Sequence, residues 1–355
     1  MTKTLLTLPG DGIGPEVIEQ TIRVIDVLKE KHGLQLNVES ALFGGACIDA
    51  NGVPIENSTI ERAKSVNAVI MGAVGGPKWA NVARDIRPEA GLLNLRKAMD
   101  VFANLRPAIC FPALADASSL KHNLVEGLDI MFVRELCGGV YFGKPKGIDI
   151  LEDGSKIGYD NAIYSTGEIE RVTHVAFELA KKRTGRVASL EKSNVMDSGL
   201  LWREVVTKIH KEYYSDMQLD HVLADNAAMQ LVRDPKQFDV LLTDNLFGDI
   251  LSDLAAAITG SIGLLPSAAL GKKGEAGLYE PIHGSAPDIA GKALANPIAA
   301  ILSFEMALRY SLDEAALADK LYAAVSKALE NGARTKDLGG NLSTKEMGDA
   351  IIEQL

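Results

Sequence analysis

Short apolar runs alternate with amphipathic stretches along most of this chain. Runs of strand length lie at 4–8, 36–42, 68–73, 108–111, 130–135, 187–190, 222–224 and 240–242. Apolar residues recur with a helical period at 15–31, 55–64, 91–101, 168–182, 198–213, 227–232 and 249–258, and the last hundred residues read as mostly helical. This alternation predicts an α/β protein with an at least partly parallel sheet.

The stretch 138–165 departs from this pattern. It consists of short strand-like pieces separated by turns, as in antiparallel hairpins. An excursion of this size is too small to fold alone, so we expect an arm that packs on another subunit. The loop 74–88 between two predicted elements reads as exposed and mobile.

Length and composition narrow the class of protein. A chain of 355 residues exceeds what one core usually supports, so we expect two lobes. A net charge of −10 argues against a nucleic-acid partner. No apolar stretch is long enough to span a membrane, and no signal segment precedes the first strand. Three scattered cysteines indicate a reducing compartment, so we expect a cytoplasmic protein.

Asp249 and Asp253 stand four residues apart in a predicted helix, which places both carboxylates on one face. A solvated helix face is the simplest interpretation of such a pair. However, apolar neighbours such as Ile250 and Leu251 indicate a largely buried helix, and buried anions need compensation. We therefore predict a hard divalent cation at this pair.

Three arginines lie near the ends of predicted elements in apolar surroundings: Arg96, Arg106 and Arg134. An internal salt bridge to Glu135 or Asp100 would explain Arg106 or Arg134 taken alone. Together, their planar guanidinium groups suit a ligand with two carboxylates.

Lys192 and Asp225 each follow a predicted strand, and strand ends are where ligand sites gather in open α/β sheets. Tyr141 is a weaker candidate, because an aromatic residue in a hairpin usually serves packing.

The segment 280–291 contains Ser285 followed by Asp288, which has the form of a helix capping box. A His-Gly-Ser loop with backbone donors would also suit a nucleotide, with Asp288 accepting from a ribose hydroxyl. The turn Gly10–Gly14 does not complete the G-x-G-x-x-G pattern, so the usual Rossmann fingerprint is absent.

These motifs together resemble the β-decarboxylating dehydrogenases, a family that acts on isopropylmalate, isocitrate, homoisocitrate and tartrate. The resemblance spans essentially the whole chain and rests on the motifs at 8–16, 134–141, 191–195, 225–229, 245–253 and 283–288. It implies a two-lobed isopropylmalate/isocitrate dehydrogenase-like fold rather than a standard Rossmann fold. Residues 1–100 with 261–355 would form a discontinuous cofactor-binding domain. Residues 101–260 would form the second domain, with the dimer interface and the 138–165 arm.

The resemblance also implies a role for each matching residue. Lys192 would be the base and Tyr141 the acid. Substrate residues would be Arg96, Arg106, Arg134, Asp225, Leu92 and Leu93, and Mg²⁺ or Mn²⁺ would be bound by Asp225, Asp249 and Asp253. NAD would be bound by Gly75, Gly76, Glu89, His283, Gly284, Ser285, Ala286, Pro287, Asp288, Ile289 and Asn296. A homodimer would share its active sites, with Lys192 and one metal aspartate coming from the partner.

The implied reaction is the NAD-dependent oxidative decarboxylation of a substituted malate. Leu92 and Leu93 favour an isopropyl group over a third carboxylate, while tartrate, malate or homoisocitrate remain alternative substrates. Two other classes stay open on residue chemistry alone. A metal-dependent phosphoryl-transfer enzyme lacks its G-x-x-x-x-G-K-[ST] loop here. A bilobal dicarboxylate-binding protein usually works outside the cytoplasm.

Overall fold

The computed structural model describes residues 2–355, which form two compact units. Unit 1 comprises the chain up to Val101, Ile109–Gly127 and Ala256–Leu355, and unit 2 comprises Phe102–Ala108 and Leu128–Ala255. The division predicted from the sequence placed 109–127 in the second domain, whereas this segment lies in unit 1. Local contacts give the reason, because Phe111 stacks on Tyr322 with ring centroids 5.5 Å apart, and Arg334 Nη2 donates to the Ala113 carbonyl at 2.7 Å.

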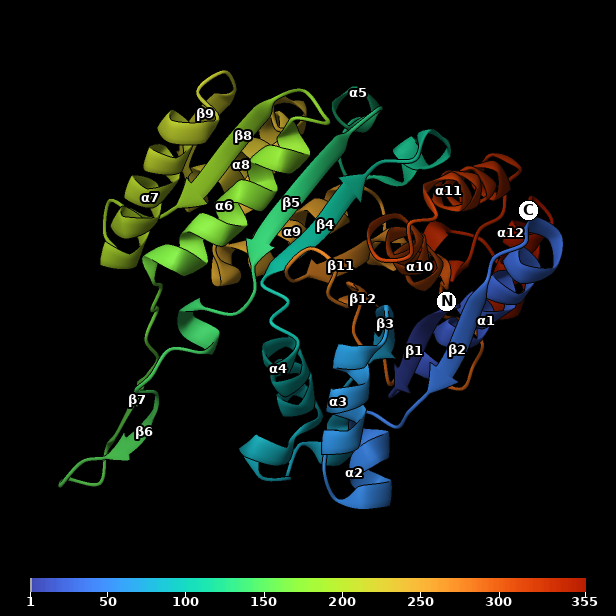
Figure 1. The fold of residues 1–355 in the computed structure, drawn as a ribbon, viewed down its shortest axis with the longest axis horizontal. Coiled ribbons are helices and arrows are strands. Elements are labelled where there is room, and N and C mark those ends of the chain that lie inside the picture. The colour runs from blue at the N-terminus through green and yellow to red at the C-terminus, as the bar shows by residue number, and fades with distance from the viewer. Residues whose placement is uncertain (1) are drawn as a thin grey trace. The chain divides into compact units, whose positions relative to one another are not determined.

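Five strands form the sheet of unit 1, in the order β2-β1-β3-β12-β11 (Figure 1). These are β1 (Lys3–Gly10), β2 (Leu36–Ser40), β3 (Ala68–Ala73), β11 (Pro266–Leu270) and β12 (Gly277–Pro281). The pairs β1–β2, β1–β3 and β3–β12 are parallel, while β11 and β12 are antiparallel. This order differs from the doubly wound dinucleotide-binding order, so the prediction that the fold is not a standard Rossmann fold is confirmed.

Helices cover this sheet and supply most of the core of unit 1. They are α1 (Gly14–His32), α2 (Gly45–Asn51), α3 (Asn57–Ser65), α4 (Pro88–Ala98), α5 (His122–Val125), α10 (Ile298–Tyr310), α11 (Ala315–Glu330) and α12 (Thr344–Ile352). Helix α10 is buried along its length from Ile298 to Leu308, and α1 packs against it through residues such as Val17. Truncating a buried aromatic such as Phe304 to alanine would cost about 3–5 kcal/mol.

Unit 2 contains a second run of five neighbouring strands, in the order β4-β5-β10-β8-β9. Its strands are β4 (Ala103–Ile109), β5 (Asp129–Glu135), β8 (Arg186–Glu191), β9 (Gln218–Leu223) and β10 (Val240–Thr243). Its helices are α6 (Thr166–Ala180), α7 (Asp197–Tyr213), α8 (Ala224–Arg233) and α9 (Asn245–Ile258). The parallel register pairs Thr243 with both Arg134 and Leu190, and Glu191 with Leu223. The carboxyl ends of β5, β10, β8 and β9 therefore meet at one edge.

A two-stranded antiparallel hairpin, β6 (Gly147–Ile150) and β7 (Lys156–Tyr159), extends away from the strands and helices of unit 2 (Figure 1). The hairpin within the predicted arm is thus confirmed. The residues Gly139–Tyr141, also expected in strand pieces, form a 3₁₀ turn instead. Ile148 and Ile150 on this hairpin are 66% and 72% exposed.

Several elements depart from the sequence-based prediction. Strand β4 begins at Ala103 rather than at 108, and α2, β11 and β12 were not predicted. The loop 74–88 is mostly exposed, as expected, but it contains 3₁₀ turns at Pro77–Trp79 and Arg84–Ile86.

Within residues 2–355, none of the helices combines the length and the apolar composition that crossing a membrane requires. Cys47 and Cys110 are buried and Cys137 is partly exposed.

Candidate active site

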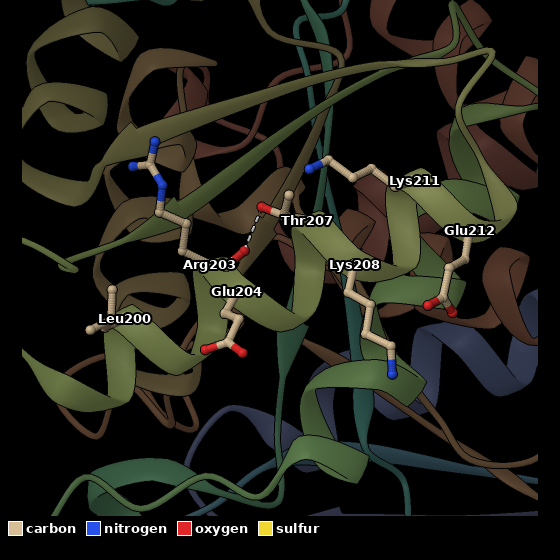
Figure 2. A pocket seen from close by; sticks show the side chains of 7 residues that line it. All are labelled: Leu200, Arg203, Glu204, Thr207, Lys208, Lys211 and Glu212. Carbon is tan, nitrogen blue, oxygen red and sulfur yellow. Dashed lines mark hydrogen bonds between the residues drawn. The ribbon is translucent and has the colours of Figure 1, made fainter.

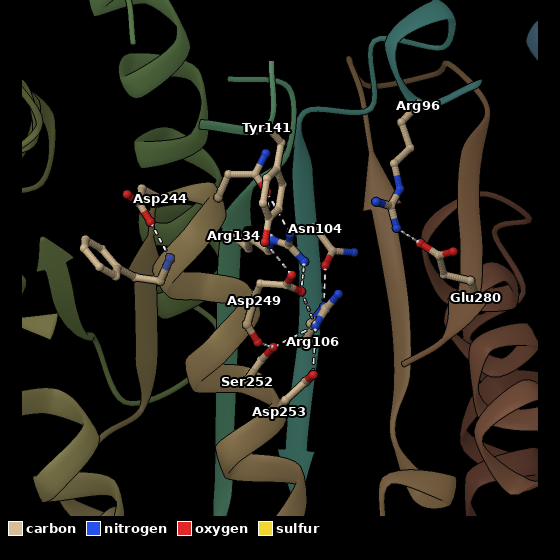
Figure 3. A network of polar contacts seen from close by, with 12 residues as sticks. Arg96, Asn104, Arg106, Arg134, Tyr141, Asp244, Asp249, Ser252, Asp253 and Glu280 are labelled. Carbon is tan, nitrogen blue, oxygen red and sulfur yellow. Dashed lines mark hydrogen bonds and ion pairs between the residues drawn. The ribbon is translucent and has the colours of Figure 1, made fainter. Parts of the chain in front are cut away.

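An aspartate pair and two arginines form the centre of a polar cluster in unit 2 (Figure 3). Asp249 and Asp253 lie one turn apart on α9, while Arg106 and Arg134 extend from neighbouring strands β4 and β5. Arg134 Nη1 lies 2.6 Å from Asp249 Oδ1. Arg106 Nη1 lies 3.3 Å from Asp253 Oδ1 and 3.5 Å from Asp249 Oδ1. The structure therefore brings together four residues that the sequence singled out.

The arginines of this cluster are buried and the aspartates are not. The side chains of Arg134 and Arg106 are 3% and 9% exposed, against 35% for Asp249 and 53% for Asp253. Helix α9 buries Leu251 as expected, but Ile250 is 59% exposed, so the helix is open beside the two aspartates. The groups that need a counter-charge are therefore the arginines rather than the aspartates. Two buried guanidinium groups require anions, and the aspartates supply them.

Neutral side chains hold both arginines in place. Arg106 Nε donates to Asn104 Oδ1 at 2.7 Å and its Nη1 donates to Ser252 Oγ at 2.8 Å. Arg134 donates through Nε and Nη2 to Asn245 Oδ1, at 3.1 and 2.7 Å. Hydrogen bonding on several sides fixes the orientation of each guanidinium group.

Gly248 allows α9 to approach this arginine closely. A Cβ atom at that position would lie 2.2 Å from Thr243 Oγ1 and 2.7 Å from Arg134 Cγ, both too close for a stable contact. The glycine in the Asn-Leu-Phe-Gly-Asp motif therefore serves to bring Asp249 within reach of Arg134.

Tyr141 belongs to the same cluster, which the hairpin predicted for it from the sequence would not have indicated. Its hydroxyl donates to Asp249 Oδ2 at 2.9 Å, and the Arg134 guanidinium carbon lies 5.9 Å from its ring centroid. Burial and the negative charge of Asp249 raise the pKa of the Tyr141 hydroxyl, while Arg134 lowers it. The group is therefore held as a neutral phenol, the form that can donate a proton.

The aspartates offer hard oxygen ligands on an accessible face, which fits a divalent cation. Burial is the main cause that raises the pKa of Asp253, and the nearby charge of Asp249 adds to it. A cation between the two would relieve that repulsion. In the described part of the chain, however, no three side chains of the His, Cys, Asp and Glu types group as a metal site. Asp225, the third predicted ligand, is not grouped with this pair.

Lys192 and Asp225 form a second pair at the carboxyl ends of β8 and β9. Lys192 Nζ lies 2.9 Å from Asp225 Oδ1, and this hydrogen bond is the main cause that lowers the pKa of Asp225. Lys192 is 23% exposed and Asp225 is 68% exposed, so the aspartate is open to solvent. The strand-end location predicted for both residues is confirmed.

Arg96 and the two leucines predicted to contact substrate lie on α4 in unit 1. Leu92, Leu93 and Arg96 are partly buried. Arg96 Nη2 forms an ion pair with Glu280 Oε1 on β12, and the two side chains are 11% and 6% exposed. The Arg96 Nε atom is buried and has no hydrogen-bond partner among residues 2–355, so one donor of this guanidinium group is uncommitted.

A mostly apolar cavity of about 310 Å³ in unit 1 brings together four predicted cofactor residues: His283, Ala286, Ile289 and Asn296. Burial lowers the pKa of His283, and its Nε2 atom is buried without a hydrogen-bond partner in the described chain. Asp288 is exposed at the surface. No helix of residues 2–355 begins at Ser285, so the capping-box interpretation does not hold there.

Several residues of these clusters were not predicted from the sequence. In unit 2 they are Asn104, Asn245 and Ser252, and in unit 1 they are Ile13, Ser261, Ile262, Gly263, Leu294, Ala295, Lys336, Asp337 and Glu280. The alternation Asn104-Leu-Arg106 in a strand could have indicated that the asparagine shares a face with the arginine. For Asp337, which accepts from Asn296 Nδ2 at 3.0 Å and Ser261 Oγ at 2.6 Å, no local signal exists.

A hollow of about 580 Å³ on unit 2 contains none of the predicted residues. Figure 2 shows that its lining side chains come from the single helix α7, spread along one side, and include Lys208 and Glu212. One helix provides only one wall, so this surface lacks the convergent polar groups of a binding site.

Comparisons with known proteins found a matching family model, similar sequences and a similar fold. The model of the isocitrate/isopropylmalate dehydrogenase family matches residues 4–351. A 3-isopropylmalate dehydrogenase of Caulobacter vibrioides is 67% identical over 99% of both chains. One of Rhodopseudomonas palustris is 57% identical over 100% of this chain and 98% of the relative. The crystal structure of isocitrate dehydrogenase from Methylococcus capsulatus superposes with a TM-score of 0.87 at 32% identity and covers 99% of each chain.

Proposed function

The chain belongs to the isocitrate/isopropylmalate dehydrogenase family, and we propose that it oxidises and decarboxylates 3-isopropylmalate with NAD. The products are 4-methyl-2-oxopentanoate (2-oxoisocaproate), CO₂ and NADH, a step of leucine biosynthesis. The observation that carries this proposal is the 67% identity over 99% of both chains with a 3-isopropylmalate dehydrogenase. Tartrate, malate or homoisocitrate as the main substrate is not favoured, because the similar relatives share the isopropylmalate name.

The charges of the unit 2 cluster support a dicarboxylate and a divalent cation as joint ligands. Arg106 and Arg134 carry two positive charges and Asp249 and Asp253 carry two negative ones, which sum to zero. A dianionic substrate and a divalent cation also sum to zero. The arginines can therefore turn from the aspartates to the substrate while the aspartates take the cation, so no buried charge is left unpaired.

The metal would be Mg²⁺ or Mn²⁺, held by Asp249 and Asp253 with Asp225 from the partner chain. When bound, it would act as a Lewis acid on the substrate oxygen. Asp225 is the residue that now holds Lys192. Lys192 must be free of that ion pair to act as a base, so the two assignments are compatible.

Two side chains would then move the protons. Lys192 would take the proton of the substrate hydroxyl, and NAD, when bound, would supply the acceptor for the hydride of the carbon that bears this hydroxyl. Loss of CO₂ leaves an enolate, and Tyr141 would protonate its carbon. Tyr141 suits this role because its raised pKa keeps the phenol protonated. Its hydroxyl now donates to Asp249, so it would exchange that acceptor for the substrate carbon.

The apolar cavity of unit 1 supports the binding of a nucleotide base, and it carries His283 and Asn296 among its polar groups. We also propose that Gly75, Gly76 and Glu89 contact the cofactor. Asp288 would accept hydrogen bonds from ribose hydroxyls and repel the 2′-phosphate of NADP.

We further propose a homodimer that shares its active sites. The exposed isoleucines of the β6–β7 hairpin support it, because apolar side chains so exposed mark interaction surfaces. The three cysteines, scattered along the sequence without a metal-ligand pattern, support a location in the cytoplasm.

A substrate panel with NAD and Mg²⁺, followed by the absorbance of NADH, tests this function. We expect 3-isopropylmalate to be oxidised far better than isocitrate, malate, tartrate or homoisocitrate. A third carboxylate beside Leu92 and Leu93 would lose several kcal/mol, by order of magnitude, through desolvation. Equal efficiency with isocitrate would contradict the assignment and leave only the family.

A further inference from the structure

We propose that Asp11 is a positioning residue that sets the affinity for the dinucleotide by holding the loop of Gly75 and Gly76 against helix α2. This inference rests on the proposed function, because it takes that loop to contact NAD. Asp11 lies in the Gly10–Gly14 turn, which the fingerprint for dinucleotide binding left unexplained and which has no role in the chemistry above.

The carboxylate of Asp11 joins two segments that are far apart in the sequence. Its Oδ2 accepts from the Gly45 N–H and from the Gly75 N–H, both at 2.8 Å, and its Oδ1 accepts from the Ala46 N–H at 2.8 Å. Asp11 is 4% exposed, so water does not compete for these bonds. One buried carboxylate thus ties the start of the loop to the first turn of α2.

The other end of the loop is attached to the same short helix. A Cβ atom on Gly45 would lie 2.2 Å from the ring of Trp79, so the indole packs directly on this glycine. Trp79 Nε1 also donates to Asp49 at 3.1 Å. Both ends of the loop therefore rest on helix α2, and Asp11 holds the helix and the start of the loop together.

The turn that carries Asp11 also contacts the second candidate cofactor loop. The Ile13 N–H donates to the Ser285 carbonyl at 2.9 Å, and a Cβ atom on Gly12 would lie 2.0 Å from that carbonyl oxygen. Ser285 belongs to the segment proposed to bind NAD. Two cofactor loops thus take their place from one turn, and a change at Asp11 acts on NAD through backbone position rather than through contact.

Asparagine cannot replace the carboxylate here. Three N–H groups point at the two oxygens of Asp11, whereas an asparagine side chain has one oxygen acceptor and directs an NH₂ group at the remaining donors. Asp11→Asn leaves at least one buried N–H group unpaired, which we expect to weaken NAD binding about tenfold.

The test compares Asp11→Asn with Asp239→Asn, a matched control in unit 2. Asp239 is 5% exposed and accepts from the Thr184 N–H at 2.9 Å, but it belongs to none of the proposed cofactor residues. Both variants are made in a Trp202→Phe background, in which Trp79 is the only tryptophan. Acrylamide quenching of Trp79 fluorescence measures how far the loop is open to solvent, and calorimetry measures the NAD dissociation constant.

We expect Asp11→Asn to raise both the quenching of Trp79 and the NAD dissociation constant. The Michaelis constant for 3-isopropylmalate, measured at saturating NAD, should change little. Asp239→Asn should lower the melting temperature and change neither signal. The inference is overturned if Asp11→Asn leaves both signals at parent values, or if Asp239→Asn reproduces them. Failure of the parent to bind NAD refutes the proposed function instead, and the quenching then decides the role of Asp11 alone.

Should Asp11→Asn not fold, Asp49→Ala tests the same attachment from its other end, because it removes the acceptor of the Trp79 N–H altogether. Asp49 lies at the surface and accepts from Trp79 Nε1 and, at 2.6 Å, from Lys78 Nζ. We expect higher Trp79 quenching and weaker NAD binding, and parent values for both would overturn the inference.

Discussion

Replacing Asp249 by asparagine tests the aspartate–arginine cluster most directly. The substitution keeps the shape of the side chain and removes one charge that faces Arg134 at 2.6 Å. It also leaves the Tyr141 hydroxyl without its anionic acceptor. Two separate effects should follow, one on stability without metal and one on the metal requirement.

The effect on stability follows from burial. Two unit charges about 4 Å apart interact by about 4 kcal/mol at an effective dielectric constant near 20. Asp249 is 35% exposed, and the amide oxygen of asparagine can still accept one N–H, so screening and replacement reduce this value. We expect the free energy of unfolding in urea to fall by about 1–2 kcal/mol in the absence of divalent cations.

The effect on metal follows from the loss of one hard anionic ligand. We expect the Mg²⁺ concentration for half-maximal NADH formation to rise at least about tenfold, which corresponds to about 1.4 kcal/mol. Asp239→Asn is the matched control, because Asp239 Oδ1 also lies 2.6 Å from an arginine, at Arg183 Nε. It should lose stability and keep the Mg²⁺ requirement. Wild-type Mg²⁺ dependence in Asp249→Asn would show that this residue only neutralises Arg134.

Three further outcomes are expected. Lys192→Ala should lower the rate of NADH formation by about 10²–10⁴-fold while the melting temperature stays within error, since the Asp225 carboxylate of its ion pair is exposed to solvent. Near-normal turnover would remove Lys192 from the chemistry. Asp288→Lys with Ile289→Tyr should shift the ratio of kcat/KM values toward NADP, and more so at low salt because Asp288 is exposed. Equal use of both cofactors by the parent would remove Asp288 as the selector. Burial raises the pKa of Glu135 to about 7 from 4.5, so the folded state keeps a proton that the unfolded state releases in this window. The stability that the neutral Glu135 carboxyl contributes to the folded state is therefore full below pH ~4.5 and is lost as pH rises to about 7. Glu135→Gln should make the free energy of unfolding, measured in urea titrations, less dependent on pH in this window. If the pH dependence of the free energy of unfolding were the same in Glu135→Gln, Glu135 would not be the group that titrates in this window.

The parallel α/β core of both units was predictable because its signal is local. Strand β3 matches the predicted 68–73 without a shift, since a wholly buried parallel strand is a continuous apolar run. Helix α1 begins at Gly14 with Pro15 in its first turn, as the sequence indicated. In contrast, β11 and β12 lack the β-branched residues of a typical strand, and they form because β12 pairs with β3 and α10 covers both.

Prediction was poorest where polar residues and a proline interrupt an apolar run. Strand β4 was placed five residues late because Asn104, Arg106 and Pro107 break its apolar run. In the structure Arg106 donates hydrogen bonds to Asn104 and to Ser252, so the buried strand can continue through these polar side chains. Such a break of the local rule at a buried strand is itself a sign of a site. Asp11 was missed for a different reason, since all three of its N–H donors are more than thirty residues away in the sequence.

The roles of cation and anion in the cluster explain why the metal and the substrate should bind together. A divalent cation alone would leave the arginines and aspartates with two excess positive charges, and a dicarboxylate alone would leave two excess negative charges. Either state places uncompensated charge beside guanidinium groups that are 9% exposed or less, which is costly. Joint binding restores neutrality, so each ligand must raise the affinity for the other, and thermodynamic linkage makes the two effects equal. The Mg²⁺ requirement of Asp249→Asn should accordingly depend on the 3-isopropylmalate concentration, because the variant starts with one unpaired positive charge and already favours the anion.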